Sequence, residues 1–434
     1  MAALTTVAFP GMRGTDDNIT NARPEAWRLG ISKIYPNGKM PLTGIMARMG
    51  SDPVSDPRFH WFEESLTTQT ATLTGTYDDV GLATAYGDGT SGDGVAGTTV
   101  YGKMTAANAL MFRVGHQVLY RSSTVPTYDV SAKVTQVVQN GANSFVAFRL
   151  LEADDNDDTV IGNTLMVTGS INPEGGDVPD SIALDPTERE NYTQIFRDSL
   201  DLTNTELATE LRTGDPYKKA QRDALELHGI QMERAAIWGI PTKNTGANGK
   251  PERTTAGIRY YINNNASANV GTYTSDGDFT GSAWTAGGDE FINKYLELAF
   301  RFGSRSKLGI CGNSALMAIS RLAGSGGQVN LLPGATKWGL RIVTWLTPFG
   351  ELHLINHPLF SLNATDLKTL MVLDTQYLRF RPLKGRDTKF RKAPRDQGGY
   401  TSIDGVKDEY ITEGGFEVKH AESMAIMYNL GDDA

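Results

Sequence analysis

The run DPYKKAQRDALELHGIQMERAAIWG, residues 215–239, constrains the fold most because it predicts one unusually long helix. Thr213 or Asp215 can cap its start, and Pro216 suits its first turn. About 23 residues ending at Gly239 would span roughly 35 Å at 1.5 Å per residue. The apolar residues fall on two lines, which predicts a spine covered on both sides: Ala220, Ala224 and Leu227 on one, Leu225, Met232 and Ala236 on the other.

The composition indicates a globular chain of about three domain-sized units. It has 434 residues, of which 39% are hydrophobic and 21% charged, and its 47 glycines indicate many turns. A net charge of -9 argues against a protein whose main task is gripping nucleic acid, because phosphate binding needs a concentrated positive face. Cys311 is the single cysteine, so we expect neither an intrachain disulfide nor a thiolate metal cluster.

No targeting segment or membrane partner is expected. The first residues, MAALTTVAFPGMRG, lack the charged start and apolar core of a signal peptide. No run approaches the 18 apolar residues that a membrane-spanning helix needs. We therefore expect a chain that is made and folded in a cytoplasm.

The first half of the sequence predicts an arm, a loop and an inserted β domain. Residues 1–45 carry few periodic apolar positions and several prolines, which is typical of an extended arm. Residues 67–101 are rich in Thr, Gly and Asp and predict a long projecting loop. Residues 105–172 hold four short apolar or alternating runs, with Asn140-Gly141 as a hairpin signal between two of them. These runs predict a small β-barrel or sandwich.

The second half predicts an α+β arrangement. Residues 289–303 place their apolar side chains on one helical stripe, and Asn313 can cap a second helix that stops at Gly324. Six further runs predict strands, and the short turns between many of them favour antiparallel pairing: LRIVTWL, ELHLINH, TLMVLD, YLRFRPL, DEYITE and GFEVKHAESMAIMYNL. The predicted fold class is α+β rather than regularly alternating α/β.

The chemistry-bearing motifs in the helical regions have structural interpretations. His228 lies two residues from Glu226 and five from Glu233, whereas helical metal ligands need separations of three or four. GGDEF at 287–291 matches the signature of diguanylate cyclases, in which glycines approach a nucleotide and acids hold Mg²⁺. That family carries the motif on a β-hairpin, whereas here it opens a helix. We favour a flexible Gly-Gly turn with Asp289 as the helix cap, and a nucleotide cyclase is the alternative.

The loop motifs also favour structural roles. GDGTSG at 87–92 and GDGVAG at 92–97 satisfy GxGxxG, but neither lies between a strand and a helix, and their aspartates would repel phosphate. The acidic run EADDNDD at 152–158 lacks the turn glycine and closing glutamate of a calcium loop. Loops and a solvated hairpin tip are favoured, and weak divalent-ion binding by the acidic run stays open.

The run LRFRPLKGRDTKFRKAPRD, residues 378–396, places eight cations beside two aspartates. A nucleic-acid patch is one interpretation. The other is salt bridging to acidic residues of another subunit, because the chain is acidic overall and strand alternation divides these charges between two faces. The sequence supports no catalytic residue set, cofactor or metal site.

Five segments together resemble one branch of the major capsid proteins of tailed bacteriophages, and they occur in that family's order: residues 59–66, 191–239, 254–262, 339–360 and 370–388. Long arms and loops are costly to order within a monomer, so we also expect them to find partners on neighbouring copies. Another self-assembling virion component is the alternative hypothesis.

The resemblance implies the Hong Kong 97-like capsid fold and a structural subunit rather than an enzyme. Hexamers and pentamers of such subunits would close an icosahedral shell around double-stranded DNA. The implied domains are an N-terminal arm at 1–45, an extended loop at 46–104 and 173–190, the inserted β domain at 105–172, a peripheral domain at 191–254 and 371–434, and an axial domain at 255–370.

The resemblance also implies partners and contact sites. Scaffold, portal and decoration proteins are possible partners, and packaged DNA would lie near the shell only through weak, non-specific proximity. Aromatic residues of exposed loops often anchor interfaces. Our candidates for contacts between subunits, or for anchoring the extended loop, are Phe59, Trp61, Glu64, Asn191 and Gln194, with Arg379 and Arg381 from the basic run.

Overall fold

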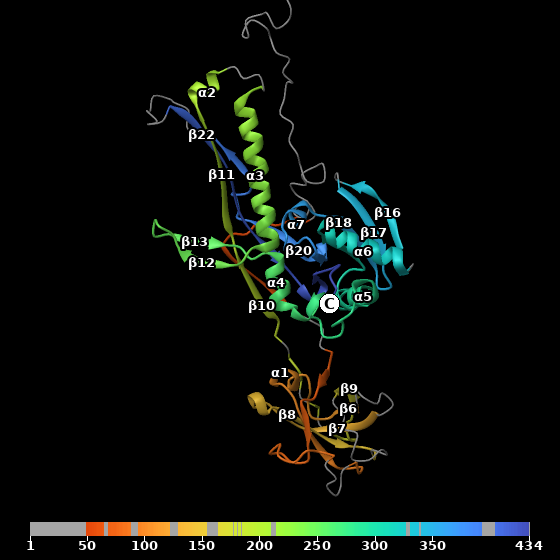
Figure 1. Cartoon of the computed structure of the whole chain (residues 1–434). Coiled ribbons are helices and arrows are strands. Elements are labelled where there is room, and N and C mark those ends of the chain that lie inside the picture. The colour runs from red at the N-terminus through yellow and green to blue at the C-terminus, as the bar shows by residue number, and fades with distance from the viewer. Residues whose placement is uncertain are drawn as a thin grey trace, which may run out of the picture. The chain divides into compact units, whose positions relative to one another are not determined.

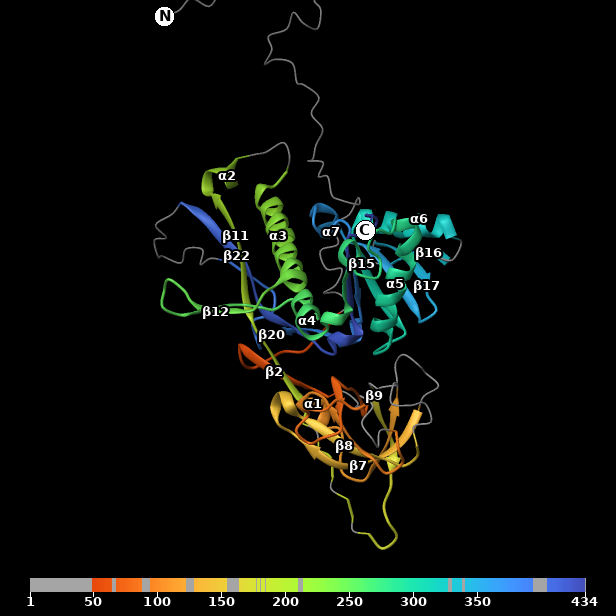
Figure 2. The same ribbon diagram turned by 60° about the horizontal axis from the view of Figure 1, so that its bottom comes forward.

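The computed structural model describes residues 49–64, 68–87, 94–121, 129–153, 164–176, 178–179, 181–183, 185–209, 214–326, 330–337, 340–392 and 404–433. The chain forms two compact units, Met1–Trp61 with Arg189–Ala434, and Phe62–Glu188. Figures 1 and 2 show the ribbon from two directions. The expected arm and most of the acidic run lie outside the described residues.

The unit Phe62–Glu188, here the β domain, is built on one seven-stranded sheet in the order β3-β9-β6-β7-β8-β5-β4. All its strand pairs are antiparallel. The sheet and the short helix α1 (Ala106–Ala109) enclose an apolar core that includes Val118, Phe148 and Leu165. The strands are β3 (Thr70–Thr72), β4 (Gly75–Tyr77), β5 (Thr99–Lys103), β6 (His116–Arg121), β7 (Asp129–Val138), β8 (Phe145–Leu150) and β9 (Thr164–Ser170).

The β domain begins well before the expected boundary at residue 105. Strands β3, β4 and β5 fall in the segment 67–101 and its edge, which the sequence predicted as a projecting loop. Their inward residues, Ala71, Thr76 and Val100, are buried. The prediction was wrong here because β3 and β4 have three residues each, too few to show the alternation that marks longer strands, and β5 begins only at the end of this segment.

The hairpin predicted at Asn140-Gly141 is confirmed, with a longer turn. Strands β7 and β8 pair on either side of it, and Gly141 has φ +52°. A 3-10 turn, Gly141–Asn143, replaces the expected two-residue turn. The Ser144 hydroxyl accepts a hydrogen bond from the Asn140 amide at 2.9 Å and donates to the Gly141 carbonyl oxygen at 2.8 Å.

The other unit contains a five-stranded sheet that carries the long helix. Its order is β1-β20-β22-β11, and β21 also pairs with β22. The runs DEYITE and GFEV belong to one long strand, and at Gly415 within it a Cβ would approach the Tyr192 carbonyl oxygen and the Phe59 ring. The strands are β1 (Gly50–Ser51), β11 (Gln194–Thr203), β20 (Leu378–Pro382), β21 (Lys389–Arg391) and β22 (Gly405–Val418). The short helix α2 (Asn204–Ala208) follows β11.

The predicted long helix is confirmed as α3 (Pro216–Trp238), which runs along β11 and β22 in Figure 1. The Asp215 side chain caps it by accepting from the amides of Tyr217 and Lys218. The expectation that both sides are covered is wrong for its first two thirds. Leu225 and Leu227 are 43% and 57% exposed, because only the side toward the sheet is covered there.

The same unit holds a second sheet of seven strands in the order β14-β23-β19-β15-β18-β17-β16. It is mixed rather than antiparallel, because β15 pairs in parallel with β18 after a chain excursion that includes the helix α6 (Asn313–Gly326). The strands are β14 (Val270–Thr272), β15 (Ser306–Cys311), β16 (Asn330–Lys337), β17 (Leu340–Leu346), β18 (Glu351–Asn356), β19 (Leu370–Leu373) and β23 (Ala425–Tyr428).

Short elements complete this unit, and the α+β class is confirmed. Helices α4 (Ile258–Asn265), α5 (Trp284–Phe300) and α7 (Pro358–Leu362) accompany the mixed sheet. The strands β12 (Thr242–Thr245) and β13 (Pro251–Thr254) form one ribbon, and β2 (Arg58–Glu63) and β10 (Thr187–Tyr192) form another. Two large apolar clusters fill the unit.

The GGDEF motif lies inside α5, so the predicted Gly-Gly turn and the Asp289 cap are both wrong. The helix begins five residues before Asp289 and is preceded by Ala283. A Cβ at Gly287 would lie 2.8 Å from the Tyr273 hydroxyl, and one at Gly288 would lie 2.8 Å from the Trp284 ring. The glycines therefore allow aromatic side chains to pack on the helix, and the hairpin on which the cyclase hypothesis depends is not present at this motif.

Candidate assembly surfaces

Strand β2 presents buried and exposed aromatic residues in alternation. Phe59 and Trp61 are buried, and their ring centroids lie 6.0 Å apart. Trp61 also makes an edge contact with Tyr261 at 5.6 Å. Phe62, which the sequence analysis did not single out, is 65% exposed. The premise that Phe59 and Trp61 are exposed is therefore wrong, since both pack within their own subunit, and Glu64 beyond them is exposed.

Asn191 and Gln194 link neighbouring segments of one subunit. The Asn191 side-chain amide donates to the carbonyl oxygens of Ala256 at 3.1 Å and Phe416 at 2.6 Å, and its oxygen accepts from the Ala256 amide at 2.8 Å. The Gln194 side-chain oxygen accepts from the Thr255 amide at 3.1 Å. Asn191 is 1% exposed, so it fixes the chain path into β11 from within.

The basic run pairs with carboxylates of its own subunit along β22. Glu409, Glu413 and Glu417 share one face of the strand because they are four residues apart. Arg381 pairs with Glu417 and, at 3.5 Å, with Asp52. The other pairs in this row join Arg386 to Glu413, Arg391 and Arg197 to Glu409, and Arg379 to Asp52. Four of the run's eight cations, Arg379, Arg381, Arg386 and Arg391, therefore pair within the subunit, which the sequence pattern alone did not show.

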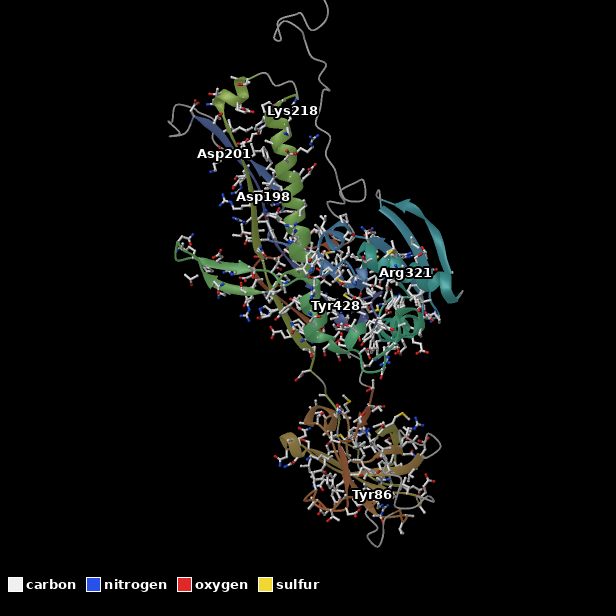
Figure 3. The ribbon with its side chains drawn as sticks, viewed as in Figure 1. Tyr86, Asp198, Asp201, Lys218, Arg321 and Tyr428 are labelled. Atoms are coloured by element: carbon white, nitrogen blue, oxygen red, sulfur yellow. The ribbon has the colours of Figure 1, made fainter. Side chains whose placement is uncertain are left out.

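A polar chain joins α3 to the five-stranded sheet. His228 bonds through Nδ1 to Asp198 and through Nε2 to the Thr412 hydroxyl, both at 2.7 Å. Thr412 donates onward to Thr388 at 2.9 Å, and the Tyr217 hydroxyl donates to Asp408 at 2.5 Å. Figure 3 labels Asp198 among the side chains between β11 and α3. The stripe 217, 220, 224, 228 would have revealed this contact if polar residues had been counted with apolar ones.

The arrangement around His228 resembles an acid, histidine and hydroxyl triad, but it is closed to substrates. His228 is 1% exposed and Thr412 is fully buried.

Burial raises the pKa of the Cys311 thiol to about 12, so that thiol is also a poor nucleophile. The described residues contain no group of three His, Cys, Asp or Glu side chains that could hold a metal ion. Among the described helices, none is long and apolar enough to cross a membrane.

A buried ion pair fixes the end of α5 to the mixed sheet. The Lys307 ammonium donates to Asp374 at 3.2 Å and to the carbonyl oxygens of Phe302 and Ser423 at 3.1 and 2.8 Å. Burial lowers the pKa of Lys307, and the Asp374 charge opposes this effect. Burial would raise the pKa of Asp374, but hydrogen bonds from Ser304 and the charge of Lys307 lower it below 3.8. All three donors of Lys307 are thus satisfied.

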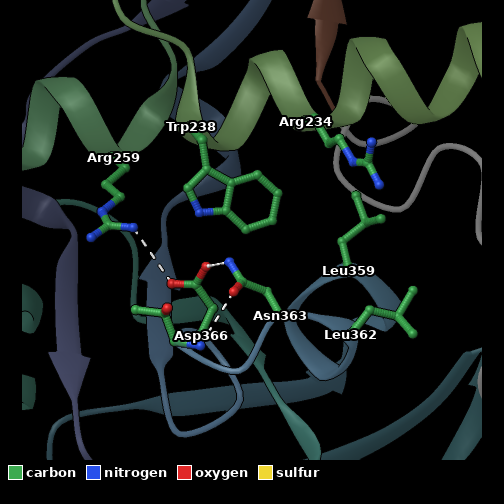
Figure 4. Close-up of a pocket in the computed structure, with 8 residues that line it drawn as sticks. Arg234, Trp238, Arg259, Leu359, Leu362, Asn363 and Asp366 are labelled. Carbon is green, nitrogen blue, oxygen red and sulfur yellow. Dashed lines mark hydrogen bonds and ion pairs between the residues drawn. The ribbon is translucent and has the colours of Figure 1, made fainter.

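Two hollows open on this unit. One, of about 650 Å³, lies beside the end of α3 and is shown in Figure 4. In it Asp366 pairs with Arg259 at 3.5 Å and accepts from Asn363 at 2.6 Å, while Trp238 and Leu362 supply apolar surface. The other, of about 560 Å³, lies on the five-stranded sheet and is lined by Arg197, Ser199, Arg391, Lys392, Lys407, Asp408 and Glu409. Both linings suit contacts with another macromolecule.

Comparisons with known proteins identify relatives of this chain. The family described as SU10 major capsid protein matches residues 12–431. A major capsid protein of Pseudomonas phage PaMx41 is 25% identical over 256 residues, which cover 57% of this chain and 59% of that protein. The chain therefore spans less than two thirds of that relative's length.

Solved structures show weaker similarity. A structure titled Mycobacterium phage Bobi is 8% identical with a TM-score of 0.43, covering 96% of this chain and 98% of that one. The holo-SrpI encapsulin complex from Synechococcus elongatus PCC 7942 is 12% identical with a TM-score of 0.39, covering 58% and 77%. These scores are too low to support an argument, so the assignment depends on the family match. Because that match runs through almost the whole chain, the protein belongs to the SU10 major capsid protein family.

Proposed function

We propose that this chain assembles with itself into hexamers and pentamers of an icosahedral shell that encloses double-stranded DNA, with the Hong Kong 97-like fold. The family match over residues 12–431 is the observation that carries this proposal. The long helix exposed along one side and the two hollows add surfaces on which neighbours can pack. Large contacts between copies would supply cohesion, and complementary charges would select orientation.

The domain roles follow the two sheets. We assign the five-stranded sheet with α3 to the peripheral domain and the mixed sheet with α5 and α6 to the axial domain. β23 pairs with β14 and β19, so it belongs with the axial sheet and not with the other C-terminal strands. We keep residues 1–45 as the arm. The extended loop would comprise the β2 and β10 ribbon, with the β domain inserted between its strands.

The net charge supports an assembly role with low affinity for the packaged DNA. A chain with net charge -9 would line the shell without binding the packaged DNA tightly. Assembly in the host cytoplasm, with scaffold, portal and decoration proteins as partners, belongs to the same proposal. Phe62, Glu64 and the exposed side of α3 are its candidate contact residues, whereas Phe59, Trp61 and Asn191 support the subunit from within.

Electron microscopy of the purified chain, expressed alone and together with its neighbouring genes, tests the proposal. We expect closed icosahedral shells with capsomers of five and six subunits. Tubes or small discrete rings in both preparations would favour another virion component. A chain that stays monomeric in both would contradict self-assembly.

A further inference from the structure

The ion pairs of Glu409, Glu413 and Glu417 follow one face of β22, and the end of this row at Glu409 differs from the rest. Glu413 and Glu417 are 5% and 1% exposed, so their pairs with arginine are closed. At Glu409 the row opens into the 560 Å³ hollow. Here the cations remain largely exposed: the side chains of Arg197, Arg391 and Lys407 are 61%, 51% and 64% exposed. The cations of the basic run are therefore closed off near Glu413 and Glu417 and remain exposed near Glu409.

Strand register explains how one hollow collects these residues. Glu409 lies opposite Ser199 on β11 and opposite Arg391 on β21. Arg197 and Lys407 are two positions away on their strands, so alternation puts them on the same face. The opposite face carries Leu200, Tyr410 and Phe390, which pack against α3. The hollow thus lies on the side of the sheet away from the long helix.

The hollow has more positive than negative charge. Its lining contains four cations and two carboxylates, and one of these, Asp408, is fully buried and bonded to the Tyr217 hydroxyl. Glu409 is shared by Arg197 at 2.5 Å and Arg391 at 3.8 Å, while Lys407 reaches Asp201 at 3.5 Å. Lys392 and the Ser199 hydroxyl have no hydrogen bond or ion pair with the described residues. Uncompensated donors remain for a partner.

We propose that this hollow docks a carboxylate-bearing surface of a second copy of the chain. Arginine forks bind planar carboxylates through paired hydrogen bonds, and Lys392 and Ser199 supply further donors. A second copy offers acidic surface because the chain carries a net charge of -9. DNA fits less well, because Glu409 at the centre would face evenly spaced phosphates, whereas a protein surface can place a donor over it.

This inference rests on the proposed self-assembly and names one of its surfaces. A basic hollow that meets an acidic surface elsewhere on the partner makes a head-to-tail contact, which closes into rings. Such complementary charges mainly raise association rates and select orientation. The contact should therefore weaken with salt.

The variant Arg391→Glu with Lys392→Glu tests the hollow in the full-length chain. Its matched control is Lys243→Glu with Lys250→Glu, which makes the same charge change on the exposed hairpin of β12 and β13. We expect both variants to melt like the parent. At low salt, light scattering should show assembly at least about tenfold slower for the hollow variant, and near the parent rate for the control. Equal rates for the hollow variant and the parent, or equal slowing in both variants, would overturn the proposal.

A direct binding assay keeps the test independent of shell formation. A fluorescent ten-residue polyglutamate peptide should bind the parent and the control, and it should lose binding to the hollow variant and to the milder Arg391→Gln, Lys392→Gln variant. A DNA duplex of ten base pairs tests nucleic acid as the alternative partner. Duplex binding that is tighter than peptide binding and lost in the same variants would overturn the assignment of a protein partner. If the parent fails to assemble but binds the peptide at this hollow, the proposed shell function fails and the carboxylate site stands.

Discussion

The β domain and the region around α3 are held together in different ways. Among the described residues of the β domain, sixteen buried apolar residues pack against one another, and the buried polar side chains are few: Thr76, His116 and Ser144. Along the first two thirds of α3, the apolar cluster has three buried members among the described residues, Leu200, Ala224 and Tyr410, whereas the last turns join the large cluster of this unit. There the polar chain through His228 joins the helix to the sheet, and the arginine pairs of β22 lie on the other face of that sheet.

This difference has a physical consequence. Apolar packing is nearly non-directional, so a closed apolar core can stabilise a unit that is inserted into another protein. Hydrogen bonds and ion pairs depend on distance and angle, so a region built on them holds one geometry and loses stability when one partner is removed.

The largest expected effect comes from comparing two deletions in the β domain that differ in their boundaries. Replacing residues 64–186 by a short Gly/Ser linker should leave the other unit folded, because β2 and β10 are kept. Deleting only 105–172 should cause misfolding or aggregation, since β3 and β5 lose their partners β9 and β8 in the sheet. Circular dichroism and solubility distinguish the two deletions. A soluble, cooperatively melting 105–172 deletion would show that the sheet does not act as one unit.

An intermediate effect is expected from the buried ion pair. Asp374→Asn should destabilise the unit that contains α3 by about 3–5 kcal/mol, because the buried Lys307 charge loses its partner. Denaturant unfolding at pH 7 measures this. Leu373, fully buried beside it, offers the apolar control: Leu373→Met should cost less than about 1.5 kcal/mol. A loss of that size for Asp374→Asn as well would mean that the charge pair contributes little.

The same carboxylate predicts an acid dependence. Because the pKa of Asp374 is lowered below 3.8 in the fold, its stabilisation is present above the unfolded pKa and is lost as the pH falls through the folded value. In the β domain, hydrogen bonds also lower the pKa of Asp79 and Asp129, but these groups are exposed and screened. Between pH 5 and pH 3 the α3 unit should therefore lose more stability than the β domain. Parallel losses in the two melting transitions would contradict this.

The smallest effect concerns two aromatic neighbours on β2. Trp61→Ala should cost about 3 kcal/mol, because its ring packs on Phe59 and Tyr261. Phe62→Ala should change subunit stability by less than about 0.5 kcal/mol, because that ring is 65% exposed. Heat resistance of assembled particles then shows whether Phe62 contacts a neighbour. If Trp61→Ala left the unfolding free energy unchanged, the buried arrangement of β2 would be wrong.

The sequence alone determined the elements with long periodicity or clear end signals. Asp215, Pro216 and Gly239 marked α3, and apolar alternation marked β6 to β9 and β17 to β20. The resemblance that named the capsid family also followed from sequence. These features are local, so a short window of residues contains all the information that specifies them.

Only the tertiary structure decided which surfaces are free. Phe59 and Trp61 were predicted as contact residues, but Tyr261 and Gly415, hundreds of residues later, bury them. Part of the basic run forms internal pairs because β22 places Glu413 and Glu417 beside Arg386 and Arg381. Burial and charge pairing depend on segments that are distant along the chain. No local pattern could therefore separate cations that pair within the subunit from cations that stay unpaired.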